Sequence, residues 1–177
     1  DVTKRKEAEM ELVRANRALK ALSSASEALV SAVDEEQFMT KLCQLIVENA
    51  GYRMAWIGFA EDDADRSVRP VAMFGYEDGY LETLNLTWAD RGRGRGPTGT
   101  AIRTGKPSIT RDILNDPNFE HWREQAIQRG YKSSISLPVE MGGRPFGALN
   151  IYASEADAFD EDEAAFLLDL AHDIAFG

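Results

Sequence analysis

Residues 131–152, YKSSISLPVEMGGRPFGALNIY, decide the fold, because they predict two antiparallel strands joined by a glycine turn. Apolar residues alternate with small or polar ones on both sides of Gly142-Gly143, which is the period of two expected for a strand. The turn length then sets the pairing, since a slip of one residue moves every side chain to the other face. A two-residue turn would pair Leu137 with Ala148 and mix polar and apolar side chains on both faces.

A three-residue turn over residues 141–143 keeps the two faces distinct, so we predict this turn. It pairs Ile135 with Leu149 and Ser134 with Asn150, and it leaves Gly143 at the left-handed position that such a turn needs. One face of the hairpin is then apolar and is expected to meet the terminal helices. The other face either forms the floor of a ligand pocket or lies partly in solvent, and the sequence leaves both alternatives open. The residues of this small, polar face are Ser134, Ser136, Ala148 and Asn150.

The composition fits one compact domain with an appendage and excludes several function classes. The chain has 177 residues, 44% hydrophobic content and a formal net charge of −10. This charge argues against binding to nucleic acid, which needs a basic footprint, and against adhesion to an anionic membrane. A single cysteine excludes an internal disulfide framework and favours a reducing compartment, so we predict a cytoplasmic protein.

Targeting signals are missing from the sequence pattern. No apolar run reaches the roughly 20 residues that span a bilayer, and the charged start DVTKRKEAEMELVR does not match a signal peptide. The sequence begins without methionine and ends within a helical pattern. We therefore expect it to be a piece of a longer protein.

The N-terminal segment predicts a long helix with a heptad seam. Residues 3–33 contain no proline or glycine, and small or apolar residues recur at alternating spacings of four and three. A helix of about 30 residues is about 45 Å long, which exceeds one small domain, so its first half either pairs with another helix or lies in solvent. We favour pairing with a second copy, giving a homodimer through the terminal helices. The seam residues are Ala8, Leu12, Ala15, Leu19, Leu22, Ser26, Leu29 and Val33.

The remaining pattern predicts an α+β domain with an antiparallel sheet. Apolar residues run almost continuously through 52–61, as in a strand covered on both faces, and the early Pro70 places the next strand at a sheet edge. The later helix 119–128 is expected to point Trp122 and Ile127 inward. The expected elements are helix 34–51, strands 52–61 and 68–75, a short helix near 80–86, helix 98–104, strand 108–113, helix 119–128, the hairpin and a last helix 160–175.

Candidate chemical groups are few. The arginines and glycines of residues 91–96, RGRGRG, predict either an anion-binding loop or a mobile solvated loop. It is not a P-loop, because no Gly-Lys-Ser/Thr follows. Cys43 adjoins an apolar helical stripe and is interpreted as core filling, since no second cysteine accompanies it. His121 and His172 are interpreted as solvent-facing.

Several stretches taken together resemble a GAF domain, the small-molecule sensor module of bacterial signalling proteins. The start DVTKRKEAE separately resembles the end of a PAS domain and the linker helix that follows it. The resemblance implies an inter-domain signalling helix over residues 1–20 and a GAF domain over 21–177, within a bacterial PAS–GAF sensor of the diguanylate cyclase or histidine kinase type. The stretches that carry the GAF resemblance are YRMAWIGFAE (52–61), GPTGTAIRTGKP (96–107), the DxxxDPxF pattern (112–119), RGYKSSISLPV (129–139) and FGALNIYA (146–153).

The resemblance implies a sheet of five or six antiparallel strands, with the terminal helices on one face and a pocket under loops and short helices on the other. It predicts a non-catalytic regulatory domain that binds a small molecule and signals through its terminal helices to a covalently linked output domain. The alternative is a dimerisation module with a vestigial pocket. Serine and asparagine side chains would offer hydrogen bonds, tryptophans would form walls, and Arg111 or the 91–95 loop would meet an anionic group. The candidate pocket residues are Trp56, Trp88, Arg111, Asp112, Trp122, Ser134, Ser136 and Asn150.

Departures from the family patterns disfavour two ligand classes and catalysis. The Asn-Lys-x(n)-Phe-x3-Asp-Glu signature of cyclic-nucleotide-binding GAF domains is missing, because Phe159-Asp160-Glu161 has no partners in the sequence. No cysteine precedes His121, where photoreceptor GAF domains attach a bilin. GAF-fold enzymes that reduce free methionine sulfoxide use several cysteines, whereas this chain has only Cys43. We therefore predict no enzymatic activity and no metal site, and the ligand stays unidentified.

Overall fold

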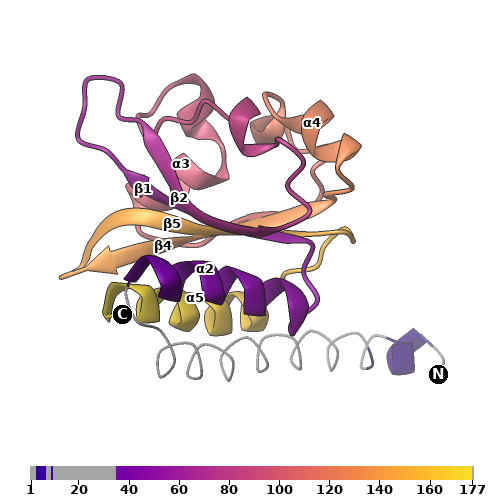
Figure 1. Cartoon of the computed structure of the whole chain (residues 1–177). Coiled ribbons are helices and arrows are strands. Elements are labelled where there is room, and N and C mark those ends of the chain that lie inside the picture. The colour runs from indigo at the N-terminus through magenta and orange to yellow at the C-terminus, as the bar shows by residue number, and fades with distance from the viewer. Residues whose placement is uncertain (1–2, 7–8, 10–34, 177) are drawn as a thin grey trace.

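The computed structural model describes residues 3–6, 9 and 35–176 (Figure 1). The heptad seam predicted over residues 8–33 lies outside the described residues, as does most of the helix predicted over 1–20. Within the part that the structure describes, no helix is both long and apolar enough to cross a membrane.

Five antiparallel strands form one sheet in the order β2-β1-β5-β4-β3, which confirms the predicted α+β class. β1 lies between β2 and β5, as its continuous apolar sequence predicted, and β2 with Pro70 is an edge strand. An isolated bridge between Ser67 and Thr87 extends this edge. The strands are β1 (Met54–Ala60), β2 (Val68–Gly75), β3 (Ser108–Thr110), β4 (Ser133–Met141) and β5 (Arg144–Ala153).

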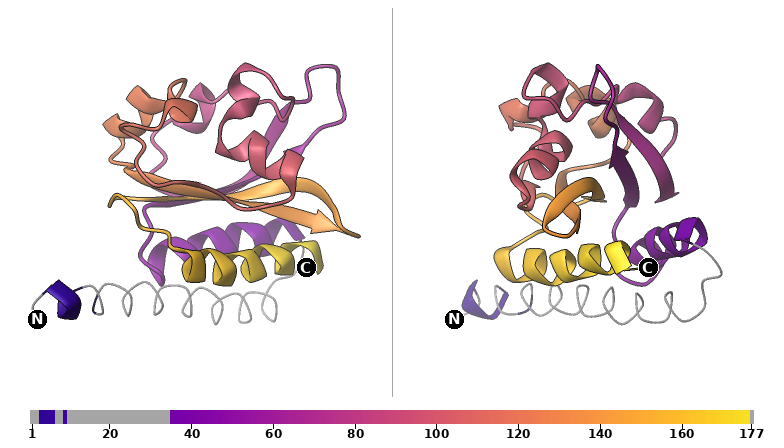
Figure 2. Two further views of the ribbon diagram at one scale, coloured as in Figure 1. Left: turned by 180° about the vertical axis from the view of Figure 1, so that it is seen from behind. Right: turned by 90° about the vertical axis from the view of Figure 1, so that its left-hand side faces the viewer.

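Helices cover the two faces of the sheet in different ways (Figures 1 and 2). The long helices α2 (Glu35–Glu48) and α5 (Glu161–Phe176) lie side by side under one face. Short helices and loops form a cover over the other face. The elements of this cover are η1 (Leu81–Thr83), η2 (Gly92–Arg95), α3 (Pro97–Thr104), η3 (Pro117–Phe119) and α4 (Arg123–Gln128).

The apolar face of the hairpin packs against the terminal helices, as the sequence predicted. One core cluster joins side chains of α2 and α5 to the sheet, and every hairpin member of it is fully buried. A second cluster joins the opposite face to the cover, and it is rich in aromatic residues. The apolar hairpin residues in the first cluster are Ile135, Leu137, Val139, Leu149 and Ile151.

The register of the hairpin corrects the predicted three-residue turn. Met141 pairs with Arg144, so the turn is Gly142-Gly143 alone, with φ of 61° and 78° as a two-residue primed turn requires. An irregularity next to Val139 then leaves one extra residue on β5, so that Ser136 pairs with Asn150 and Leu137 with Leu149. The actual register differs from the predicted one by two residues. Since side chains alternate with a period of two, the predicted faces are nevertheless right.

The structure also corrects the predicted set of buried side chains in the helix over residues 119–128. Ile127 is 46% exposed, although we expected it inside. The α-helix begins only at Arg123, so Trp122 and Ala126 stand four residues apart on the buried side, and Ile127 turns away from it. Trp122 is buried as predicted, with 2% exposure.

Candidate functional site

The polar face of the hairpin is buried under the cover and forms a hydrogen-bonded cluster. The amide oxygen of Asn150 accepts hydrogen bonds from Thr98 Oγ1 on α3 at 2.8 Å and from Ser136 Oγ at 2.6 Å. All three residues are at most 3% exposed. The amide oxygen therefore joins β4, β5 and the cover, and the alternative of a solvated outer face is wrong.

Two further hydroxyl groups in this layer are buried without a hydrogen-bond partner among the described residues. They are Ser134 Oγ and Tyr80 Oη. A buried polar group without a partner costs about 1–3 kcal/mol. The Tyr80 hydroxyl still interacts with the hydroxyl of Tyr152. Ser134 Oγ is therefore the atom of this pair that can accept or donate a bond to a polar group entering the layer.

Aromatic side chains fill the space around the polar cluster. Trp56 Nε1 donates to the Tyr152 hydroxyl at 3.0 Å, and Trp122 Nε1 donates to the Leu84 carbonyl at 2.9 Å. The Tyr152 ring also contacts those of Tyr80 and Tyr131, with centroids 5.5 and 4.8 Å apart. Burial raises the pKa of Tyr152 to about 12, because the phenolate would lose its hydration.

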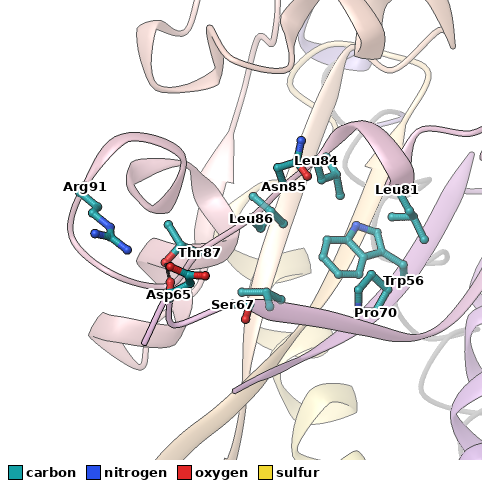
Figure 3. A pocket seen from close by; sticks show the side chains of 11 residues that line it. Trp56, Asp65, Ser67, Pro70, Leu81, Leu84, Asn85, Leu86, Thr87 and Arg91 are labelled. Atoms are coloured by element: carbon teal, nitrogen blue, oxygen red, sulfur yellow. Dashed lines mark hydrogen bonds between the residues drawn. The ribbon is translucent and has the colours of Figure 1, made fainter. Parts of the chain in front are cut away.

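An open pocket of about 510 Å³ lies beside this aromatic layer, between the β2 edge and the segment 81–91 (Figure 3). Trp56 and Leu84 form its floor. Their side chains are only 0% and 4% exposed, so the other lining residues separate them from the open space. Figure 3 shows Trp56 at one end and Arg91 at the other. The lining residues are Trp56, Asp65, Ser67, Val68, Pro70, Leu81, Leu84, Asn85, Leu86, Thr87 and Arg91.

Backbone pairing holds the pocket rim against the sheet edge. Val68 N donates to the Leu86 carbonyl at 3.3 Å, and Trp88 N donates to the Arg66 carbonyl at 2.8 Å. Below the rim, a Cβ on Gly58 would stand 2.6 Å from the Trp56 ring. The glycine on β1 thus makes room for the indole on the floor of the pocket.

The arginine-glycine loop is a packed turn. Gly94 and Gly96 are buried, and a Cβ on Gly96 would stand 2.2 Å from the Trp122 ring. Arg93 donates to the Leu84 carbonyl at 2.9 Å, which fixes the loop to the cover. Arg91, by contrast, is exposed and lines the open pocket.

Of the eight predicted pocket residues, Trp56 alone lines the open pocket. Arg111 forms an exposed ion pair with Asp157 at 3.0 Å. Asp112 accepts a hydrogen bond from the backbone N of Leu114 at 3.1 Å and so supports a turn. Trp88 donates to the Glu61 carbonyl at 2.9 Å. Trp88 also packs against the buried aromatic cluster, so only Arg111 and Asp112 lie apart from it. The predicted residues that the structure brings together in or next to the buried layer are Trp56, Trp88, Trp122, Ser134, Ser136 and Asn150.

Several pocket residues were not predicted as site residues. The apolar spacing of Leu81, Leu84 and Leu86 suggested a short helix, but no pattern showed that this segment crosses the edge of β2. Ser67 and Asp65 lie in a turn between strands and gave no signal of a site. The pairing of Ser67 with Thr87, which closes the rim, is a tertiary feature.

The cysteine considered for catalysis is buried, whereas the two histidines are exposed. Cys43 is 0% exposed, and burial raises the pKa of its thiol to about 12. His121 and His172 are exposed, as predicted. Among the described residues, no group of three or more His, Cys, Asp or Glu side chains is arranged to hold a metal ion.

A five-stranded antiparallel sheet with terminal helices on one face and a covered layer on the other defines a GAF-like α+β domain. The model of the GAF domain family matches residues 32–177, and the chain belongs to this family. It is 28% identical over 173 residues to the methyl sulfide methyltransferase-associated sensor of Methanosarcina acetivorans. This match covers 94% of the chain but only 16% of that sensor.

Solved structures share the fold. The GAF domain of a phosphoenolpyruvate-protein phosphotransferase from Coxiella burnetii matches with a TM-score of 0.74 and 23% identity, covering 92% of each chain. Free methionine-R-sulfoxide reductase from Neisseria meningitidis, solved with its substrate, matches with a TM-score of 0.72 and 18% identity, covering 90% of this chain and 86% of that one. At these identities the likeness concerns the fold alone.

Proposed function

We propose that this chain is the regulatory, sensory domain of a longer signalling protein, and that it binds a small molecule in the open pocket. The observation that carries the proposal is the position of the sheet, which lies between this pocket and the terminal helices α2 and α5. Membership of the GAF domain family and the sensor among its relatives support this role. The pocket volume of about 510 Å³ lies in the usual range for small-molecule sites.

The proposed signal passes through the strands. Trp56 on β1 lies under the pocket, whereas its neighbours Ala55 and Ile57 belong to the core cluster that contains α2 and α5. A ligand changes the output only if its affinity differs between two arrangements of the helices. The proposal therefore requires that a ligand bound above the buried Trp56 favours one packing of the helices over another. The receiver is an output domain in the same polypeptide, which also carries a PAS domain.

We propose that the domain is not catalytic. A thiol acts as a nucleophile in its thiolate form, and the buried Cys43 thiol is held protonated by its raised pKa. The alternative role as a dimerisation module also keeps a specific observation in its favour. The polar atoms of Asn150 are already bonded within the protein, and aromatic rings fill the layer around it.

Thermal shift measurements with a panel of metabolites test the sensory role. We expect at least one compound to raise the Tm of the wild-type protein and to lose this effect in Leu86→Trp, which places a large ring in the pocket. Met141→Trp is the matched control, since Met141 is 63% exposed and does not line this pocket. Equal shifts in both variants would show that the ligand binds elsewhere.

The mass of the protein in solution tests the dimerisation role. We expect a homodimer that dissociates when Leu19 and Leu22 are replaced by polar residues. A strictly monomeric protein at high concentration would contradict the proposed dimer. If no compound in the panel shifts the Tm while the dimer persists, the vestigial-pocket alternative replaces the sensory role.

A further inference from the structure

The open pocket carries one cationic and one anionic side chain at the same end. Arg91 and Asp65 both line it, and Figure 3 shows them near Thr87, at the end away from Trp56. Neither charged group forms a hydrogen bond or an ion pair with the described residues, and the two are not paired with each other. Both charges therefore remain open to a ligand.

Unlike the Arg91 guanidinium, the guanidinium groups of neighbouring arginines are bonded within the protein. Arg95 pairs with Asp90 at 3.2 Å, and Arg103 donates to the Gly94 carbonyl at 2.5 Å. Arg93 donates to the Leu84 carbonyl. These guanidinium groups hold the cover together, so the loop needs no structural contribution from the Arg91 charge.

The opposite end of the pocket is apolar. Trp56 of β1, Pro70 of β2 and Leu81 of η1 lie together there in Figure 3. Asn85 lines the middle of the pocket, and its side chain is exposed. The pocket therefore changes from apolar to charged along its length.

We infer that the ligand is a small zwitterion with an apolar tail, of the amino-acid or betaine class; this inference rests on the proposed function for the assignment of the pocket. The carboxylate of the ligand pairs with the Arg91 guanidinium, which suits bidentate binding of carboxylates. The cationic nitrogen faces the Asp65 carboxylate, and the tail lies against Pro70 and Leu81, which cover the buried Trp56.

The charge pattern discriminates against other ligand classes. A simple anion would gain from Arg91 but would be repelled by Asp65, and a simple cation would meet the reverse. A polyanion such as a nucleotide would also face the net charge of −10. A zwitterion matches both charges and brings no net charge into the pocket.

Calorimetric titration with L-leucine and L-phenylalanine as probes tests this ligand class. We expect each to bind more tightly than its analogue without the carboxylate, such as leucinamide, and its analogue without the ammonium group, such as 4-methylpentanoate. Because the Arg91 and Asp65 side chains are exposed, removing either charged group from the ligand should weaken binding by about 3- to 10-fold. Equal binding of the amino acid and either analogue would overturn the inference.

Charge-neutralising variants identify the two partners. Arg91→Gln should make L-leucine and leucinamide bind alike, and Asp65→Asn should do the same for L-leucine and 4-methylpentanoate. Arg144→Gln and Asp62→Asn are matched controls, since both positions are exposed and lie outside the pocket lining. If the controls weaken binding as much as the pocket variants, the assignment of partners is wrong.

The outcomes also separate this inference from the proposed function. If neither amino acid binds but another compound raises the Tm and loses this effect in Leu86→Trp, the pocket is a sensory site for a different class, and only the zwitterion inference fails. If no compound binds the pocket, both the inference and the sensory role fail.

Discussion

Replacing Asn150 with alanine should destabilise the domain more than any exposed substitution, because this side chain accepts two buried hydrogen bonds. Its amide oxygen Oδ1 accepts hydrogen bonds from Thr98 Oγ1 at 2.8 Å and from Ser136 Oγ at 2.6 Å. The amide nitrogen makes longer contacts of 3.4 Å with the carbonyls of Trp56 and Ala148. The two short bonds therefore determine the size of the effect.

The expected magnitude follows from the two hydroxyl groups that lose their acceptor. Each buried, unsatisfied polar group costs about 1–3 kcal/mol, so the pair costs about 2–6 kcal/mol. Rotation of the hydroxyls towards other acceptors offsets part of this, whereas the lost side-chain volume adds to it. We expect Asn150→Ala to lower the free energy of unfolding by about 3–5 kcal/mol, a large share of the stability of a small domain.

Urea denaturation of four variants tests this reasoning. Thr98→Val removes one hydroxyl while preserving shape, and it should cost about 1 kcal/mol in the wild-type background. In the Asn150→Ala background the same change removes an orphaned hydroxyl, so it should be neutral or stabilising. Asn118→Ala, at an exposed position, is the control and should change stability by less than about 0.5 kcal/mol. The reasoning is refuted if Thr98→Val has the same effect in both backgrounds.

Three further predictions concern the packing and the buried titratable groups. Gly96→Ala should destabilise the fold by about 1–3 kcal/mol in urea denaturation, since its Cβ would stand 2.2 Å from the Trp122 ring; an unchanged midpoint would show that the ring moves freely. Cys43 should resist thiol reagents in the native protein and react fully in urea, because its thiol is 0% exposed; rapid native labelling would contradict the described core. Burial raises the pKa of Tyr152 from 10.0 to about 12, so its contribution to stability is complete below pH 10.0 and is lost as the pH rises towards 12. Phenolate absorbance should show this delayed ionisation, and ordinary titration of every tyrosine would exclude it.

The hairpin shows how far sequence alternation reaches. The alternation assigned Ile135 and Leu149 to the helix side and Ser136 and Asn150 to the cover side, and the structure confirms both. The turn was wrong because the extra residue on β5 lies opposite no residue of β4, and no periodicity marks such a residue. Alternation defines faces, whereas the register also depends on where a strand is interrupted.

The site was predictable only where it rests on the regular strands. Asn150 could be assigned to the covered layer because strand alternation and the family resemblance agree there. Trp56 was assigned from the resemblance alone, since the continuous apolar run of its strand does not distinguish the two faces. Asp112 was predicted as a pocket residue from its position in the DxxxDPxF motif, and Arg111 as the partner of an anionic group, but the contacts of this segment are local. Asp112 supports the turn that follows it, and Asp116 accepts a hydrogen bond from Asn118 N at the start of η3. The polar side chains of this segment thus stabilise its own turns by accepting backbone hydrogen bonds, and their presence does not indicate a ligand site.

In the proposed route, β1 itself transmits the signal. Its side chains alternate, so Trp56 lies at the pocket floor while Ile57 packs in the core cluster with the terminal helices. A Cβ on Gly147 of β5 would stand 2.4 Å from the Gly58 carbonyl, which shows how closely these strands approach. Because close-packed elements move as units, a ligand that displaces Trp56 has to shift β1 together with β5. Under this proposal, a ligand that only rearranges the cover gives no signal, whereas one that displaces the buried Trp56 acts on the helices.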